Sequence, residues 1–210
     1  MNKKILKKTL AGVFAFAIAA SSVYISPPAK LNINSITASA ASADRLADIY
    51  GDTYKSAFEK YFKMGGLFNL TKLRKDYIID NYDLFSEDDI LMPDCMLDQA
   101  ACQASGSESE VQISLNFADR ALKFCEENGI SLFGSTFVWY SQTPDWFFRE
   151  GFKSNAAYVD KETMNKRLES FIKNTFEALK KEYPDLKIDG YEVCKEVFVS
   201  DGGGMRPAAV

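Results

Sequence analysis

The spacing of apolar residues predicts two long amphipathic helices in the second half of the chain. Residues 114–130 have one apolar helical face, with Ser114 as the expected N-cap and Gly129 near the expected end. The apolar positions of that face are three or four residues apart: Leu115, Ala118, Leu122 and Cys125. A second helix is expected from the N-cap Asp160 to Tyr183, which a proline follows.

Shorter and mostly apolar segments between the helical ones predict strands. We expect these strands at residues 62–69, 83–94, 130–139 and 186–198. Two further helices are expected at 44–61 and 70–82, and a polar loop at 101–112. The alternation predicts right-handed βαβ units with a parallel sheet, an α/β protein. The pattern alone leaves two architectures open, a doubly wound sheet and part of a (β/α)8 barrel.

The composition is that of a folded domain and excludes several kinds of chemistry. Of 210 residues, 47% are apolar and 13% aromatic, which is enough to bury a core. The net charge of −4, without a basic stripe, argues against a nucleic-acid partner. The chain has no histidine, so Ser-His-Asp triads, Cys-His dyads and histidine-ligated zinc are excluded. No metal site and no cofactor is expected, and proton transfer must use carboxylates, tyrosines or lysines.

The N-terminal segment has the features of an export signal. Four lysines at positions 3, 4, 7 and 8 precede an apolar run at 10–20 that is too short to span a bilayer. Cleavage is expected near Ala40 or Ala43, so residues 1–43 are predicted to be a signal peptide and spacer and 44–210 a secreted domain. An uncleaved, membrane-tethered form is the alternative.

The four cysteines have no CxxC spacing. Cys95 and Cys102 are the only pair expected to form a local disulfide. Cys125 and Cys194 lie in helix and strand patterns, where we expect small, buried apolar side chains.

Polar and aromatic residues follow the predicted strands and suggest a sugar site. They are Asn69 after the first strand, Asp88 and Asp89 after the second, Trp139, Tyr140 and Gln142 after the third, and Lys195 and Glu196 at the fourth. Aromatic rings stack on sugar rings, while carboxylates and amides bind hydroxyls. Asp88 and Asp89 could equally be a solvated loop.

Three segments resemble motifs of glycoside hydrolase family 10, the endo-1,4-β-xylanases. "GSTFVWYSQTPDWFFREGF" (134–152) resembles "GHTxVWHSQTPDWFF", and "DDILMPDCMLD" (88–98) resembles "ENEMKPDxLLD". "GYEVCKEVFVSDGGGMRP" (190–207) resembles "xYDVVNEVFxxDGGGxR". The resemblance implies a (β/α)8 barrel, of which about the first four βα units are present, and retaining hydrolysis of internal β-1,4 bonds of xylan. Xylan or xylo-oligosaccharide is the implied partner.

The resemblance also implies roles for individual residues. Glu196 matches the acid/base, and the positions that match the glycone-side sugar subsites are Asn69, Asp88, Asp89, Ser135, Trp139, Gln142 and Lys195. Several motif residues are replaced: Ser135 and Tyr140 stand for histidines, Met92 for a lysine and Lys195 for an asparagine. Each lost partner of a buried sugar hydroxyl costs roughly 1–3 kcal/mol.

The length leads to an expectation about activity. A full barrel needs about 250 residues, whereas 44–210 comprises about 167. We therefore expect a truncated catalytic domain that lacks the nucleophile strand and has no xylanase activity alone, because retaining hydrolysis needs two carboxyl groups. The alternatives are a non-catalytic, secreted carbohydrate-binding protein and a half barrel that self-associates or pairs with a complementing half.

Overall fold

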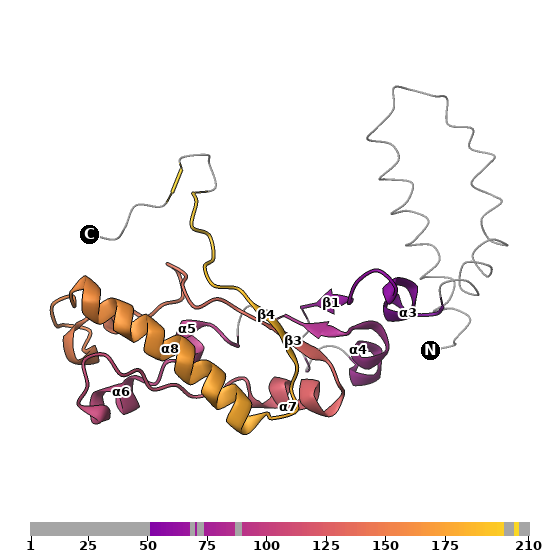
Figure 1. Ribbon diagram of the computed structural model, residues 1–210, viewed down its shortest axis with the longest axis horizontal. Helices are drawn as coiled ribbons and strands as arrows, with labels where there is room; N and C mark the ends of the chain where they lie inside the picture. Colours follow the sequence, from indigo (N-terminus) through magenta and orange to yellow (C-terminus); the bar gives the residue numbers. More distant parts are fainter. Residues whose placement is uncertain (1–50, 68–69, 71–73, 87–89, 200–203, 206–210) are drawn as a thin grey trace, which may run out of the picture. The chain divides into compact units, whose positions relative to one another are not determined.

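The computed structural model describes residues 51–67, 70, 74–86, 90–199 and 204–205 (Figure 1). The predicted signal peptide and spacer lie outside these residues. The chain divides into two compact units, Met1–Met64 and Gly65–Val210, and each is described by itself. No helix in the described part of the chain is long and apolar enough to cross a membrane.

The described part of the first unit contains one short helix, α3 (Tyr54–Phe58). Thr53 and Ser56 form a capping box, in which each side chain binds the other residue's backbone N–H. The expected helix over 44–61 is therefore found only in part, since 44–50 lie outside the described residues.

The second unit is built on a parallel sheet of four strands, as predicted. Their order in the sheet is their order in the chain, β1-β2-β3-β4. The strands are β1 (Gly65–Gly66), β2 (Leu84–Phe85), β3 (Ser131–Gly134) and β4 (Ile188–Tyr191). A doubly wound sheet reverses its strand order at a switch point. The described strands show no such reversal. Of the two predicted architectures, this order is that of a barrel.

All four strands are shorter than the apolar segments that predicted them. An apolar run reports burial, whereas a strand also requires a hydrogen-bonded partner at each position. After β2, Met92 instead precedes a short helix, α5 (Pro93–Met96), with proline at its first position. The strand expected at 83–94 was therefore predicted too long at its C-terminal end.

Among the described residues between β1 and β3 there are four helices. They are α4 (Lys75–Asn81), α5, α6 (Gln99–Ser105) and α7 (Asp119–Glu127). The loop expected at 101–112 is wrong in its first part, because the Asp98 side chain caps α6. The predicted N-cap Ser114 is also wrong: α7 begins after Ala118, and the Ser114 hydroxyl accepts a bond from the Asn116 N–H.

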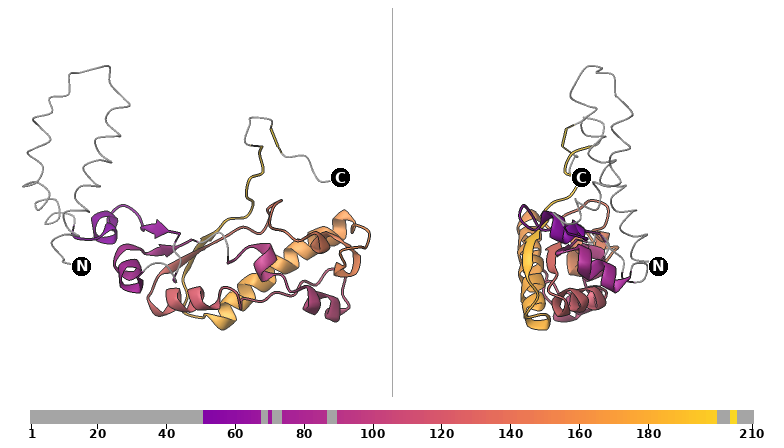
Figure 2. Two further views of the ribbon diagram at one scale, coloured as in Figure 1. Left: turned by 180° about the vertical axis from the view of Figure 1, so that it is seen from behind. Right: turned by 90° about the vertical axis from the view of Figure 1, so that its right-hand side faces the viewer.

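The long helix α8 (Lys161–Glu182) covers one side of the unit (Figures 1 and 2). The Asp160 side chain accepts from the Thr163 N–H, which confirms the predicted N-cap. On the inner face of α8, the Phe171 ring packs edge-on against Phe137, with centroids 5.3 Å apart. α8 thereby anchors the segment that leaves β3.

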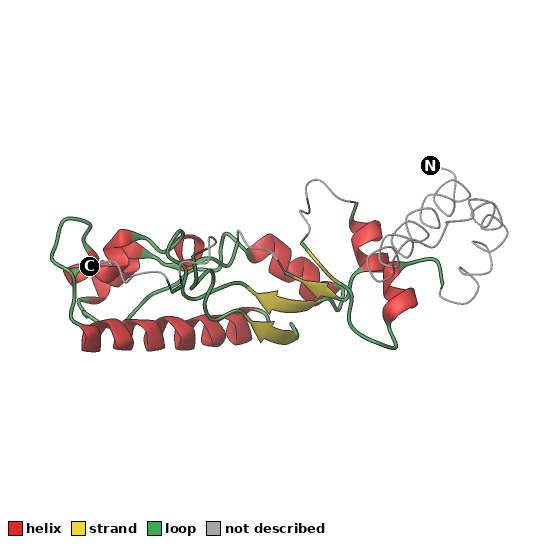
Figure 3. Ribbon diagram, turned by 90° about the horizontal axis from the view of Figure 1, so that it is seen from above, coloured by secondary structure: helices red, strands yellow, loops and turns green. Residues whose placement is uncertain are grey.

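Glycines allow β3 and β4 to pack closely in the sheet seen in Figure 3. The Tyr191 ring lies where a side chain on Gly134 would project, and it stacks on Phe137 at 4.2 Å. A Cβ on Gly190 would come within 2.7 Å of the Phe133 ring. In each of the two strands, a glycine thus leaves space for an aromatic ring of the other strand.

None of the four cysteines forms a disulfide, so the expected bridge between Cys95 and Cys102 is not present. The buried Cys102 sulfur accepts a bond from the Gln112 N–H at 3.1 Å. Cys125 is buried, as predicted, but Cys194 is exposed. The strand pattern failed at Cys194 because β4 ends at Tyr191.

Candidate functional site

The chain segments that continue β3 and β4 remain paired beyond the strands. Val138 and Cys194 form an isolated parallel bridge. The Val138 N–H donates to the Val193 carbonyl, and the Lys195 N–H donates to the Val138 carbonyl, both at 3.0 Å. This pairing places Trp139 beside the Lys195–Glu196 dipeptide.

Thr136 strengthens the same pairing from within. Its side chain is fully buried, and its Oγ1 lies 3.1 Å from the carbonyl oxygens of Val138 and Val193. Sequence analysis did not single out this residue. Its position inside the apolar segment 130–139 could have identified it, because a polar side chain that is buried there needs a hydrogen-bond partner.

Trp139 and Glu196 form the central contact of the site. The Trp139 indole Nε1–H donates to Glu196 Oε2 at 3.0 Å. Glu196 is exposed and Trp139 half-buried. The carboxyl group predicted to transfer protons is therefore held by an aromatic ring from the neighbouring strand end, while it stays open to a ligand.

Glu196 has a backbone conformation that residues with side chains rarely adopt. Its φ is +52°, in the left-handed region. Such a conformation costs about 1–3 kcal/mol and is found disproportionately at active sites. The main chain turns at the residue that carries the candidate acid/base.

Lys195 lies over the same indole. Its Nζ is 4.8 Å from the centre of the Trp139 ring, within the range of a cation–π contact. Tyr140 meets that ring edge-on, with centroids 6.2 Å apart. Trp139 is thus bordered by an ammonium, a carboxyl group and a phenol.

The loop after Trp139 is held by hydrogen bonds within itself and to α5, the short helix that follows β2. The Thr143 hydroxyl donates to the Trp139 carbonyl at 2.7 Å. The Gln142 carbonyl accepts from the Asp94 N–H of α5 at 3.1 Å. These two hydrogen bonds hold the half-buried Gln142 in the loop that begins with Trp139.

Ser135 and Met92, which replace two motif residues, contact each other. The Ser135 Oγ donates to the Met92 sulfur at 3.6 Å, and their exposed fractions are 4% and 0%. Each replacement thus fills space beside the other. The role of Ser135 at a sugar subsite remains a prediction.

The other predicted subsite residues, Asn69, Asp88 and Asp89, lie outside the described residues. Of the predicted site, the structure brings together Trp139, Lys195 and Glu196. No cluster of His, Cys, Asp or Glu side chains suited to a metal ion occurs within the described ranges.

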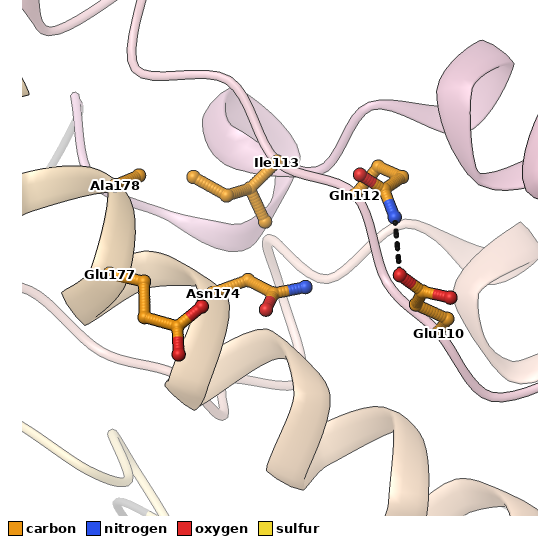
Figure 4. Close-up of a pocket in the computed structure, with 6 residues that line it drawn as sticks. All are labelled: Glu110, Gln112, Ile113, Asn174, Glu177 and Ala178. Atoms are coloured by element: carbon orange, nitrogen blue, oxygen red, sulfur yellow. Dashed lines mark hydrogen bonds between the residues drawn. The ribbon is translucent and has the colours of Figure 1, made fainter. Parts of the chain in front are cut away.

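A pocket elsewhere in the unit contains none of the predicted site residues. It has a volume of about 240 Å³, and its lining residues are Asn174, Glu177 and Ala178 of α8 together with Glu110, Gln112 and Ile113 (Figure 4). The Asn174 amide donates to the Val111 carbonyl at 2.5 Å, and Ser170 Oγ accepts from the Val111 N–H at 2.9 Å. These bonds attach the segment around Val111 to α8. The pocket therefore lies where this segment packs against the helix.

Comparisons with known proteins identify one family over most of the chain. The family model described as "Glycosyl hydrolase family 10" matches residues 53–210. The bifunctional endo-1,4-beta-xylanase XylA of Ruminococcus flavefaciens is 54% identical over 159 residues, which are 75% of this chain and 17% of that protein. Endo-1,4-beta-xylanase Y of Acetivibrio thermocellus is 33% identical over 156 residues, which are 72% of this chain and 14% of that protein.

A solved structure resembles the same region. It is the N-terminal endo-1,4-beta-D-xylanase 10B of Clostridium thermocellum, complexed with xylohexaose, with a TM-score of 0.65 and 32% identity. The match covers 71% of this chain and 31% of that one. The chain therefore spans less than a fifth of these two curated relatives and about a third of this solved one.

Proposed function

Because the chain belongs to glycosyl hydrolase family 10, we propose that residues 51–210 form the acid/base half of a xylan-hydrolysing site. In this proposal Glu196 exchanges a proton with the glycosidic oxygen, and Trp139 and Gln142 contact the sugars on the glycone side. The partner is β-1,4-xylan or a xylo-oligosaccharide. The fold is the first part of a (β/α)8 barrel, with the site at the C-terminal ends of its strands.

The contact between Trp139 and Glu196 is the observation that carries the proposal. The indole N–H donates to one carboxyl oxygen, Oε2, at 3.0 Å. An indole N–H only donates, so Oε2 accepts this bond in both protonation states, and the proton is left to Oε1. A carboxyl group fixed in this way can give its proton to a leaving oxygen and later accept one from water.

Hydrolysis with retention needs a second carboxyl group about 5–5.5 Å from the first. The residues that the structure brings together at the site, Trp139, Lys195 and Glu196, supply one carboxyl group, that of Glu196. We therefore predict that residues 1–210, produced alone, bind xylan but release no reducing ends from it. Release that Glu196→Gln abolishes would contradict the inactivity.

Binding is tested by affinity electrophoresis in soluble xylan. The wild-type chain should be retarded, and Trp139→Ala should remove the retardation. Tyr158→Ala is the matched control, because Tyr158 is also an exposed aromatic residue, 57% exposed, but is not part of the site. Equal mobility of all three in gels with and without xylan would reject a sugar-binding role.

A chimera tests the proton transfer itself. Residues 51–210 would be joined to the remainder of the catalytic domain of the Ruminococcus flavefaciens relative. The chimera should hydrolyse xylan, and Glu196→Gln should lower kcat about 100- to 10,000-fold. A folded and active chimera whose kcat does not respond to Glu196→Gln would reject the acid/base role.

A non-catalytic carbohydrate-binding protein is the second candidate. The buried Ser135–Met92 contact favours it, since two positions of the motif now pack against each other. A chimera that is folded, retarded by xylan and inactive would support this second function over the first.

We also propose that the chain is exported. The lysines and apolar run at residues 3–20 support this, and cleavage near Ala40 or Ala43 would give the mature protein. N-terminal sequencing of protein from the culture medium tests it. Exclusive recovery of an uncleaved chain from membranes would favour the tethered form.

A further inference from the structure

We propose that Lys195 makes the sugar site selective for xylo-oligosaccharides that carry a carboxylate, such as a uronic acid side group. The inference rests on the proposed function, since it assumes that sugars bind at Trp139. It goes further because it assigns a charge preference to the substrate and names the residue responsible.

The first step is the position of the Lys195 ammonium. The backbone N–H of Lys195 is fixed to the Val138 carbonyl at 3.0 Å, and Nζ lies 4.8 Å from the Trp139 ring centre. The side chain is half-buried. A lysine held in this way along an aromatic ring places its charge at the surface on which a sugar would stack.

The second step is the way in which the two charged side chains contact the indole. Glu196 meets the edge of the indole through the Nε1–H, whereas Lys195 lies over the ring. A ligand carboxylate drawn to Lys195 would approach over the ring rather than along the edge that Glu196 occupies. The two charged side chains therefore use different parts of the indole, its face for Lys195 and its N–H for Glu196.

The third step concerns the positively charged residues in the segments that form the site. Lys195 is the only lysine or arginine in 134–144 and 191–199, the sequence segments that form the site. The chain as a whole has a net charge of −4. Within these two segments, Lys195 is therefore the residue that can attract an anionic substrate.

The fourth step is the chemistry of recognition. An ammonium donates hydrogen bonds and accepts none, and its bonds to carboxylates are roughly twice as strong as those between neutral groups. The asparagine of the resembling motif carries no charge. A half-exposed charge pair contributes up to about 1 kcal/mol, which corresponds to about a fivefold difference in affinity.

Isothermal titration calorimetry on residues 1–210 tests the proposal with two ligands, xylotriose and xylotriose bearing one glucuronic acid side group. The wild-type chain should bind the acidic ligand about fivefold more tightly at low salt. Lys195→Gln should remove this preference, whereas Lys195→Arg should retain it. High salt should reduce the preference of the wild-type chain.

Lys161→Gln is the matched control, because it removes the same charge from the exposed start of α8. It should leave the preference unchanged. Equal affinity of the wild-type chain for the two ligands, or a preference that survives Lys195→Gln, would overturn the role of Lys195 alone. Failure to bind either ligand, or xylotriose binding that Trp139→Ala leaves intact, would overturn the proposed function as well.

Discussion

Tyr183 and Asp119 join the end of α8 to the start of α7 by one hydrogen bond. The Tyr183 hydroxyl donates to Asp119 Oδ1 at 2.9 Å, and Tyr183 is only 2% exposed. Burial, together with Asp119, raises the pKa of Tyr183, so its hydroxyl stays a donor at all ordinary pH values. The hydrogen bond from Lys123 lowers the pKa of Asp119 below its usual value, and the hydrogen bond from Tyr183 adds a smaller decrease.

This lowered pKa predicts the pH dependence of a single substitution. A carboxyl group with a lowered folded-state pKa stabilises the fold above its unfolded pKa of about 3.9, and this stabilisation is lost as the pH falls. Tyr183→Phe should therefore lower the urea midpoint clearly at pH 7 and much less near pH 3. Lys123→Met should act in the same direction. A Tyr183→Phe effect that is equal at both pH values would contradict this assignment.

Arg167, on α8, binds the segment that contains Phe147 and Arg149, which lies between the site loop and α8 in the chain. Its guanidinium is fully buried and donates to the carbonyl oxygens of Glu108, Phe147 and Arg149 at 2.6–2.8 Å. It also lies 3.8 Å from the centre of the Phe152 ring. Glu108 adds an ion pair at 3.0 Å, but its side chain is 59% exposed. The backbone carbonyls are therefore the partners that depend most on this arginine.

Replacing this one side chain should destabilise the whole unit. Arg167→Met leaves three carbonyl groups without this donor, and the one of Phe147 is in a fully buried contact. A buried group left unpaired costs about 1–3 kcal/mol, so we expect a loss of at least this order. Urea unfolding measures it. Glu108→Gln, which removes the negative charge of this exposed side chain and keeps one acceptor oxygen, should cost less than about 1 kcal/mol. Comparable effects of the two substitutions would show that the ion pair matters more than the carbonyl contacts.

Helices could be predicted from local chemistry better than strands. The α8 helix and its cap Asp160 were visible in the sequence because apolar spacing and a capping side chain are local features. The α6 helix was missed although Asp98 provides the same kind of cap, because its polar and small residues resembled a loop. Strand ends could not be located, since they depend on partners from distant parts of the chain.

At the scale of the molecule, the sheet of the second unit has two edges. Within the described residues, β1 pairs only with β2 and β4 only with β3. Apolar side chains are exposed at β4 and in the segment after it, including Ile188, Val193 at 59% and Phe198 at 66%. Unpaired strand edges beside apolar side chains favour association with another chain.

We therefore expect residues 1–210, produced alone, to self-associate as the concentration rises. Val193→Lys should weaken this association, which light scattering would measure. Phe117→Lys is the control, because Phe117 is 65% exposed but precedes α7 and is not in the sheet. A clean monomer at every concentration, or equal effects of both substitutions, would contradict association through this edge.

The candidate site was predictable in its members but not in its contacts. Trp139, Lys195 and Glu196 were selected because they follow predicted strands, and the structure brings them together. The sequence did not show that the Trp139 N–H binds Glu196 across 57 residues. It also did not show that Ser135 turns towards the Met92 sulfur, because contacts between distant segments depend on the register of the strands.

The exposed thiol of Cys194 provides a natural attachment point for a probe. Cys102 and Cys125 are buried and Cys95 is half-buried, so a maleimide dye at limiting concentration should modify Cys194 first. The dye would sit two positions before Glu196, in the bridge with Val138. Ligand arrival could then be followed in real time by fluorescence, without any engineered cysteine.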